Sequence, residues 1–221
     1  MNRHPALPWV LPFAVFMLML SVGPHLGLPQ RAELAVRLIV PAAALLVFSR
    51  RILDFRCSAP WLSILVGVGV FVIWVAPDVL IPGYRDSILF QNALTGQLKS
   101  TLPPEAREDL LAIAMRVARA VLLVPVVEEL FWRGWLMRWL ARPDFEKLPL
   151  GHYDARAFWI TAILFATVHG PYWDVGLVTG AVYNGWLVKT RRLGDLFLAH
   201  AVTNACLAAF VLWSGRWELW L

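Results

Sequence analysis

The chain has 221 residues, of which 59% are hydrophobic and only 16% are charged, against roughly 25% charged residues in soluble domains. This composition excludes an ordinary soluble domain and indicates a protein embedded in a membrane. The net charge of +5 lies mainly in short loops between apolar runs, so it indicates topology and contact with membrane lipids, and we expect no nucleic-acid partner.

Apolar runs recur along the whole chain and predict an all-α fold, a polytopic transmembrane bundle of seven or eight helices. The runs cover about residues 8 to 25, 34 to 49, 60 to 81, 110 to 141, 156 to 169, 173 to 188 and 195 to 213. No linker or repeat divides the chain, so we expect a single membrane domain over residues 1 to 221. Its N-terminal helices, in residues 1 to 109, carry no specific motif, and the candidate chemistry lies in residues 110 to 213.

Two of these runs differ from the usual span of about 20 residues. The run 110 to 141 is too long for one simple span, and Pro125 in its middle lacks a backbone donor, so we expect a kink or two helices. The run 156 to 169 is short, and Gly170 and Pro171 interrupt the pattern directly after it. This helix is therefore expected not to cross the bilayer fully.

Two basic loops determine the predicted topology. The first contains Arg50, Arg51 and Arg56, and the second contains Lys189, Arg191 and Arg192. The positive-inside rule places both loops in the cytoplasm, and the N-terminus follows them. The polar stretch 78 to 109 then lies on the opposite side. For a bacterial chain the expected location is the inner (cytoplasmic) membrane.

Three charged residues lie close together inside one apolar run, where each costs about 2.5 to 3.5 kcal/mol to insert. Arg133 follows Glu129 by one helical turn and is expected to pair with it. Glu128 points about 100° away and has no partner in its own helix. An interhelical ion-pair network that only fixes packing is the alternative, and we favour it for Glu129 and Arg133. Glu128 is the candidate base for activating water.

Histidines occur on two further apolar runs. His169 follows Phe165 by one turn, and His200 precedes Asn204 by one turn, so the members of each pair share a helix face. Each histidine alone is equally consistent with a hydrogen-bonded core residue. Their occurrence together with an intramembrane glutamate favours a functional site.

The sequence gives less support for a zinc site or for a catalytic cysteine nucleophile. Two histidines and a glutamate are possible zinc ligands, but the HExxH spacing is absent and the carboxamide of Asn204 is a poor zinc ligand. Cys206 faces another side of its helix from Asn204, and Cys57 lies in a basic loop. We therefore expect no metal and no cofactor.

Three short motifs together resemble a known family. E-E-x-x-x-R starts at Glu128, F-x-x-x-H ends at His169, and H-x-x-x-N starts at His200. Their order on successive apolar runs is similar to that of the CAAX prenyl protease and bacteriocin-processing (CPBP) family, the Rce1-like intramembrane glutamate peptidases. The similarity covers about residues 110 to 213. Within the family, the chain looks most like the bacterial group associated with exosortase sorting systems.

The resemblance implies a metal-independent endopeptidase acting on a membrane-associated peptide or lipidated protein. Glu128 and His169 would together activate a water molecule that attacks the scissile carbonyl. His200 and Asn204 would hold the developing oxyanion, where one donor contributes about 2.7 to 4 kcal/mol. Glu129 and Arg133 would provide orientation and structural support.

Two other functions compete with a peptidase. A non-catalytic accessory or immunity-type membrane protein would keep the polar cluster for folding or binding. A small transporter is less favoured, because the chain has no inverted repeat and its polar groups lie in its second half. The sequence does not predict an oligomeric state.

The predicted topology conflicts with the predicted site. It places Glu128 and His200 nearer the cytoplasmic ends of their helices and His169 nearer the opposite end. The residues meet only if the short run 156 to 169 begins deep within a cavity or if the long run breaks at Pro125.

Overall fold

A computed structural model describes residues 4–220, in which every regular element is a helix apart from one isolated β-bridge between Asn92 and Gly96. The α-helices are α1 (Leu7–Val22), α2 (Gln30–Ala44), α3 (Pro60–Leu80), α4 (Leu110–Ala118), α5 (Val124–Glu129), α6 (Met137–Ala141), α7 (Ala155–Thr167), α8 (Trp173–Thr190) and α9 (Leu193–Ser214). Short 3-10 and π segments extend or connect them: η1 (Gly23–His25), η2 (Leu45–Ser49), η3 (Pro104–Arg107), η4 (Arg119–Leu123), η5 (Leu130–Leu136), η6 (Phe145–Lys147), η7 (Gly170–Tyr172) and η8 (Trp217–Leu219).

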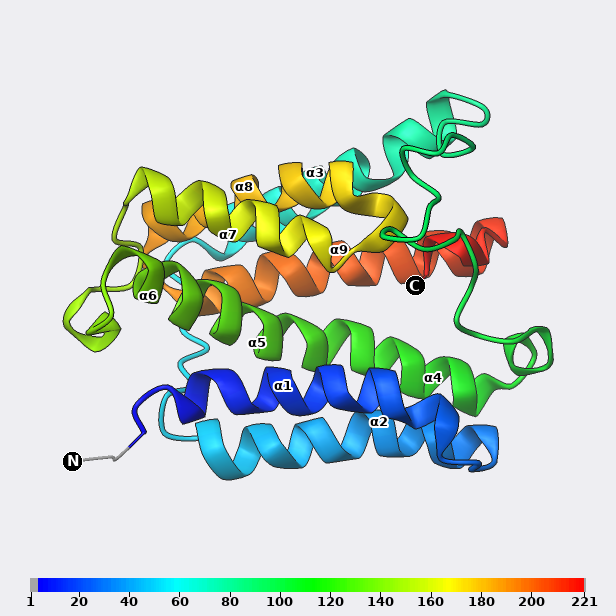
Figure 1. Cartoon of the computed structure of the whole chain (residues 1–221), viewed down its shortest axis with the longest axis horizontal. Coiled ribbons are helices and arrows are strands. Elements are labelled where there is room, and N and C mark those ends of the chain that lie inside the picture. Colours follow the sequence, from blue (N-terminus) through cyan, green and yellow to red (C-terminus); the bar gives the residue numbers. More distant parts are fainter. Residues whose placement is uncertain (1–3, 221) are drawn as a thin grey trace.

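The predicted all-helical bundle is confirmed. Because α4 to α6 form one continuous helical run, the part of the chain that the structure describes contains seven long helices (Figure 1). Five stretches within residues 4–220 are long and apolar enough to cross a membrane: Leu7–His25, Gln30–Ser49, Pro60–Leu80, Leu110–Ala141 and Leu193–Ser214. The chain is therefore an integral membrane protein.

The helices lie side by side along the long axis of the molecule, with their connections at its two ends (Figure 1). α1 packs against α2, α2 against α4, α3 against α9, and α7 against α8. α5 and η4 contact α9, so the long helical run lies beside the last helix. This arrangement brings the motifs of three separate sequence segments to one region of the bundle.

The run from Leu110 to Ala141 is a single helix with two widened turns. The π segments η4 and η5 lie directly before and after α5, and Pro125 is the second residue of α5. Proline has no N–H to donate, and the wider π turn before it accommodates that loss without breaking the helix. The expected irregularity is thus present, but as two π segments and not as a division into separate helices.

α7 is short and ends at Thr167. Its 13 residues correspond to about 20 Å at 1.5 Å per residue, less than the roughly 30 Å of a bilayer core. Two glycines of α8 let this helix press closely on α7: a Cβ at Gly180 would lie 3.0 Å from the Cα of Ala162, and one at Gly176 would lie 3.4 Å from the Cβ of His169. The close packing fixes the position of the chain where α7 ends.

The two predicted basic loops lie at the same end of the bundle, together with the start of α1 (Figure 1). Asp195 in the first turn of α9 accepts hydrogen bonds from the backbone N–H groups of Ser58 and Ala59, which joins the loop before α3 to the start of α9. Residues 81 to 109 lie at the other end, as expected. The assignment of the basic end to the cytoplasm stays a prediction.

Candidate active site

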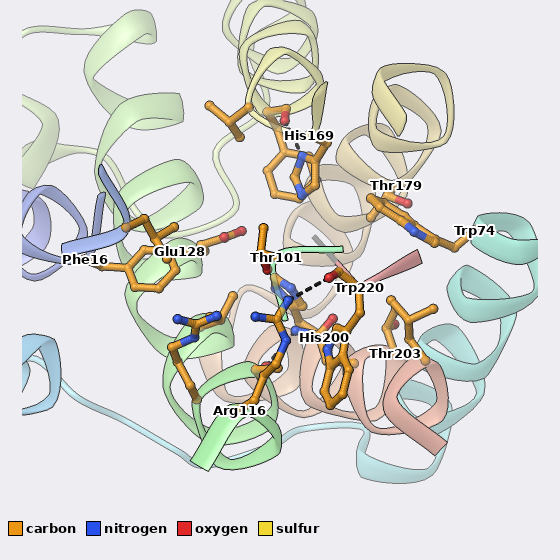
Figure 2. Close-up of a pocket in the computed structure, with 18 of the residues that line it drawn as sticks. Phe16, Trp74, Thr101, Arg116, Glu128, His169, Thr179, His200, Thr203 and Trp220 are labelled. Atoms are coloured by element: carbon orange, nitrogen blue, oxygen red, sulfur yellow. Dashed lines mark hydrogen bonds between the residues drawn. The ribbon is translucent and has the colours of Figure 1, made fainter. Parts of the chain in front are cut away.

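A cavity of about 320 Å³ lies among the helices and contains all four predicted catalytic residues in its wall (Figure 2). Glu128 reaches it from α5, His169 from the turn after α7, and His200 and Asn204 from α9. The predicted topology placed His169 far from Glu128 and His200, and this prediction is wrong. α7 ends early, so His169 lies inside the bundle and not at its far surface.

Glu128 occupies the buried wall of this cavity. Its side chain is only 8% exposed, and its Oε2 atom has no hydrogen-bond partner among the described residues. A buried carboxylate oxygen without a partner is costly, so it is expected to bind water or substrate. The position agrees with the sequence prediction that Glu128 is not held by its own helix.

Glu129 and Arg133 form the predicted ion pair, with Arg133 Nη1 3.2 Å from Glu129 Oε1 and both side chains fully buried. Arg133 also donates from Nε to Asn184 Oδ1 at 2.8 Å and from Nη2 to the carbonyl oxygen of Gly180 at 3.3 Å. Its guanidinium lies over the ring of Phe165, 4.3 Å from the centroid. The pair therefore joins the long helix to α7 and α8.

His169 is held in one orientation. Its Nδ1 lies 2.7 Å from the carbonyl oxygen of Phe165, so Nδ1 carries the proton that it donates to that acceptor. The imidazole ring packs 4.5 Å from the ring of Phe165 and 5.3 Å from that of Trp74. This hydrogen bond leaves Nε2 with a lone pair that can accept a proton.

His200 and Asn204 make contacts that sequence spacing did not predict. Nδ1 of His200 lies 2.8 Å from Oε1 of Glu129, and its ring packs against Tyr183. Asn204 Nδ2 donates to the carbonyl oxygen of Ala120 in the π segment η4, at 2.7 Å. One N–H of the Asn204 amide remains for another acceptor.

Several lining residues were not predicted from the sequence. They include Arg37, Arg116, Arg119, Tyr183 and Thr203. Thr203 Oγ1 donates to the carbonyl oxygen of Gly67 at 2.8 Å and lies 2.7 Å from the hydroxyl of Tyr183. Arg116 and Arg119 could have been found from sequence, because a charged residue inside an apolar run is a functional candidate by default.

Residues 4–220 contain no group of three His, Cys, Asp or Glu side chains arranged to hold a metal ion. Nδ1 of His169 is hydrogen-bonded to a backbone carbonyl oxygen, and Nδ1 of His200 to the carboxylate of Glu129. Metal independence remains a prediction.

In the comparisons with known proteins, one family model matches part of the chain. Residues 110–206 match the family model described as Rce1-like: Type II CAAX prenyl endopeptidase Rce1-like. The matched region contains all three motifs, from Glu128 to Asn204. No curated protein and no solved structure matches the chain.

Proposed function

We propose that this chain, whose residues 110–206 belong to the Rce1-like family, is a metal-independent glutamate endopeptidase that hydrolyses a membrane-associated or lipidated peptide inside the bilayer. The match to this family supports protease activity in general, without specifying the substrate or the catalytic residues. The observation that carries the finer proposal is that Glu128, whose buried Oε2 has no hydrogen-bond partner among residues 4–220, lines the same cavity as His169 (Figure 2).

Glu128 and His169 activate water in this mechanism. A water molecule bound between the carboxylate of Glu128 and Nε2 of His169 meets two acceptors, because Nδ1 of His169 donates to the carbonyl oxygen of Phe165. One acceptor takes a proton as the water oxygen attacks the carbonyl carbon of the scissile peptide bond. The cavity is lined largely by apolar side chains, so little other water competes.

His200 and Asn204 stabilise the tetrahedral oxyanion. Nδ1 of His200 is hydrogen-bonded to the carboxyl group of Glu129, so Nε2 is the ring nitrogen left for the substrate, and it donates to the oxyanion when it carries a proton. The free N–H of the Asn204 amide is the second donor. Removing one such donor typically costs about 10²–10³ in kcat.

The reaction is completed by breaking the C–N bond of the substrate. The proton taken from water moves to the leaving amine nitrogen, and the carbonyl carbon keeps the hydroxyl oxygen as a carboxylic acid. One water is consumed for each bond cut, and Glu128 and His169 return to their initial state. No covalent intermediate is needed.

The apolar wall of the cavity suits a substrate with a hydrocarbon group. Phe13, Phe16, Met17 and Leu20 of α1 line it beside the candidate catalytic residues. An alkyl or isoprenyl chain can pack against these side chains by van der Waals contact. In the predicted topology the protein lies in the bacterial inner membrane with its N-terminus in the cytoplasm.

The test compares purified wild type with Glu128→Gln, which keeps the size of the side chain but cannot act as a base. Both proteins receive a library of lipidated peptides in detergent, with and without EDTA, and mass spectrometry identifies the products. Glu105→Gln on an exposed turn is the matched control. Equal thermal unfolding temperatures of the three proteins establish that the fold is kept.

Cleavage by wild type and Glu105→Gln that resists EDTA and disappears in Glu128→Gln is the expected result. Cleavage abolished by EDTA would contradict metal independence. Equal cleavage by all three proteins would remove Glu128 from the mechanism. Peptide binding without cleavage would favour the alternative, a non-catalytic accessory or immunity-type protein.

A further inference from the structure

An uncharged loop follows α3 at the end of the bundle opposite the two basic loops (Figure 1). Residues 87 to 98 contain no Asp, Glu, Lys or Arg. Three large apolar side chains of this segment are exposed: Ile88 by 83%, Leu89 by 58% and Leu94 by 97%. We call residues 87 to 94 the apolar loop.

Hydrogen bonds within this segment fix its shape. Asn92 Nδ2 donates to the carbonyl oxygen of Ile88 at 2.8 Å. Asn92 Oδ1 accepts from the N–H groups of Leu94 and Thr95 at 2.8 and 3.1 Å, and Thr95 Oγ1 donates to the carbonyl oxygen of Phe90 at 2.7 Å. Irregular backbone next to lipid needs its polar groups bonded within the protein. The apolar loop therefore has the internal bonding that contact with lipid requires.

The apolar loop is also fixed to the bundle. Phe90 is buried, with its ring 6.0 Å from the ring of Trp173 and 5.0 Å from the guanidinium of Arg85. Arg85 pairs with Asp78 near the end of α3 at 2.9 Å and with Asp174 in the first turn of α8 at 2.7 Å. These contacts hold the exposed side chains of the loop in a fixed place at this end of α3 and α8.

The turn beneath this segment lies at membrane depth. The 13 residues of α7 and the 18 residues of α8 correspond to about 20 and 27 Å, both less than the roughly 30 Å of a bilayer core. The turn between these helices is covered by the segment that carries the apolar loop, because a Cβ at Gly170 would lie 2.8 Å from the carbonyl oxygen of Thr95. The loop is therefore at about the boundary of the hydrocarbon core.

The apolar loop continues a surface that faces lipid. One face of the membrane-spanning helix α3, defined by residues 3, 4 and 7 positions apart, is apolar and exposed: Leu65, Val68, Val72 and Val79. Leu80 and Ile81, which are also exposed, extend the apolar surface from the end of α3 toward the loop. The same solvent, lipid, is therefore the natural partner of both surfaces.

We infer that the apolar loop inserts into the lipid interface at this end of the bundle, with Ile88, Leu89 and Leu94 at the boundary between headgroups and acyl chains. The polar stretch 78 to 109 then lies only partly outside the membrane. The inference goes beyond the proposed function and does not depend on it. Lipid would contact the protein beside Gly170, the residue that directly follows His169.

The depth of the loop is measured with a fluorophore and two kinds of quencher. Cys57→Ser and Cys206→Ala remove the native thiols, and Leu94→Cys then provides one site for an environment-sensitive label. The labelled protein is reconstituted in phosphatidylcholine liposomes. Lipids with a nitroxide at a shallow or a deep acyl position quench from the bilayer, and iodide on both sides of the membrane quenches from water.

Two further positions calibrate the measurement. Val72→Cys places the label on the lipid-facing side of α3, near the middle of that helix. Glu105→Cys places it on an exposed turn at the same end of the bundle as the loop. All three positions are exposed, so the label replaces no core packing, and equal thermal unfolding temperatures establish that the fold is kept.

The label at position 94 should be quenched by the lipid nitroxides, more by the shallow one than by the deep one, and protected from iodide. The ratio of the two lipid signals should place it about 15 Å from the bilayer centre, at the edge of the hydrocarbon core. The label at position 72 should lie closer to the centre. The label at position 105 should be quenched mainly by iodide.

Two results would overturn the inference. Quenching at position 94 by iodide as strong as at position 105, with little quenching by the nitroxides, would place the loop in water. Protection of position 94 from both kinds of quencher would assign the surface to a second copy of the chain, because no other protein is present in the liposomes.

Discussion

The carboxylate of Glu129 lies 2.8 Å from Nδ1 of His200, although 71 positions separate the two residues in sequence. The same oxygen, Oε1, lies 3.2 Å from Nη1 of Arg133. Glu129 therefore connects an ion pair that stabilises the bundle to a histidine in the wall of the cavity. Its neighbour Glu128 makes neither contact, and its Oε2 atom has no hydrogen-bond partner among residues 4–220.

Arg133→Met should destabilise the protein strongly. It would leave the carboxylate of Glu129 fully buried without its guanidinium and would remove the donors to Asn184 Oδ1 and to the carbonyl oxygen of Gly180. Breaking a buried ion pair by removing one partner costs about 3–5 kcal/mol. Thermal unfolding in detergent measures the loss, with Arg142→Met on the exposed turn after α6 as the control. Equal unfolding temperatures of the two variants would contradict a stabilising role.

His169→Gln should lower kcat by about 10²–10⁴ while the unfolding temperature changes little. Glutamine can hydrogen-bond to the carbonyl oxygen of Phe165, but it offers no basic nitrogen equivalent to Nε2. Cleavage of the best peptide from the library gives kcat and KM. The exposed His152 supplies a matched control, His152→Gln, which should cleave at the wild-type rate. A His169→Gln variant that also keeps that rate would remove His169 from the mechanism.

Much of the fold was predictable because membrane insertion imposes long apolar runs. The unusual length of the run containing Pro125 and the shortness of the run before Gly170 were both visible in the sequence. Periodicity placed Arg133 one turn after Glu129, and the ion pair follows from that local rule. Local rules fail where contacts come from distant segments, which is why the bond between Glu129 and His200 was not predicted.

The depth of His169 in the bundle was also not predictable from the sequence. The predicted topology assumes that each helix starts at the membrane surface and crosses the bilayer in a straight line. On that assumption, His169 and Glu128 lie near opposite sides of the membrane. α7 instead stops at Thr167 and turns inward, and its depth is fixed by packing on Gly176 and Gly180 of α8. Such packing is a property of the assembled bundle.

Asp195→Ala should destabilise the bundle by about 2 kcal/mol or more. Asp195 is fully buried and accepts four hydrogen bonds at the start of α3: from the backbone and hydroxyl of Ser58 at 2.7 and 2.8 Å, and from Ala59 N and Ser63 Oγ at 2.9 Å each. Alanine would leave these donors without their acceptor. Thermal unfolding checks the loss, and exposed Asp54→Ala at the same end should stay within about 0.5 kcal/mol of wild type. Similar losses in both variants would contradict a specific cap.

Asp109 should stabilise the protein in a pH-dependent way. It caps α4 by accepting from the N–H groups of Leu111 and Ala112, and Arg31 Nε donates to its Oδ2 at 2.6 Å. The hydrogen bond from Arg31 is the main cause that lowers the pKa of Asp109 below its ordinary value of about 3.9. A lowered pKa in the folded state means stability that is fully present above about pH 4 and is lost as pH falls through the folded value. The unfolding temperature of wild type should therefore exceed that of Asp109→Asn by a constant amount near neutral pH, and the difference should shrink below about pH 4. Arg31→Gln should remove most of that pH dependence, whereas a difference that grows as the pH falls would contradict the assignment.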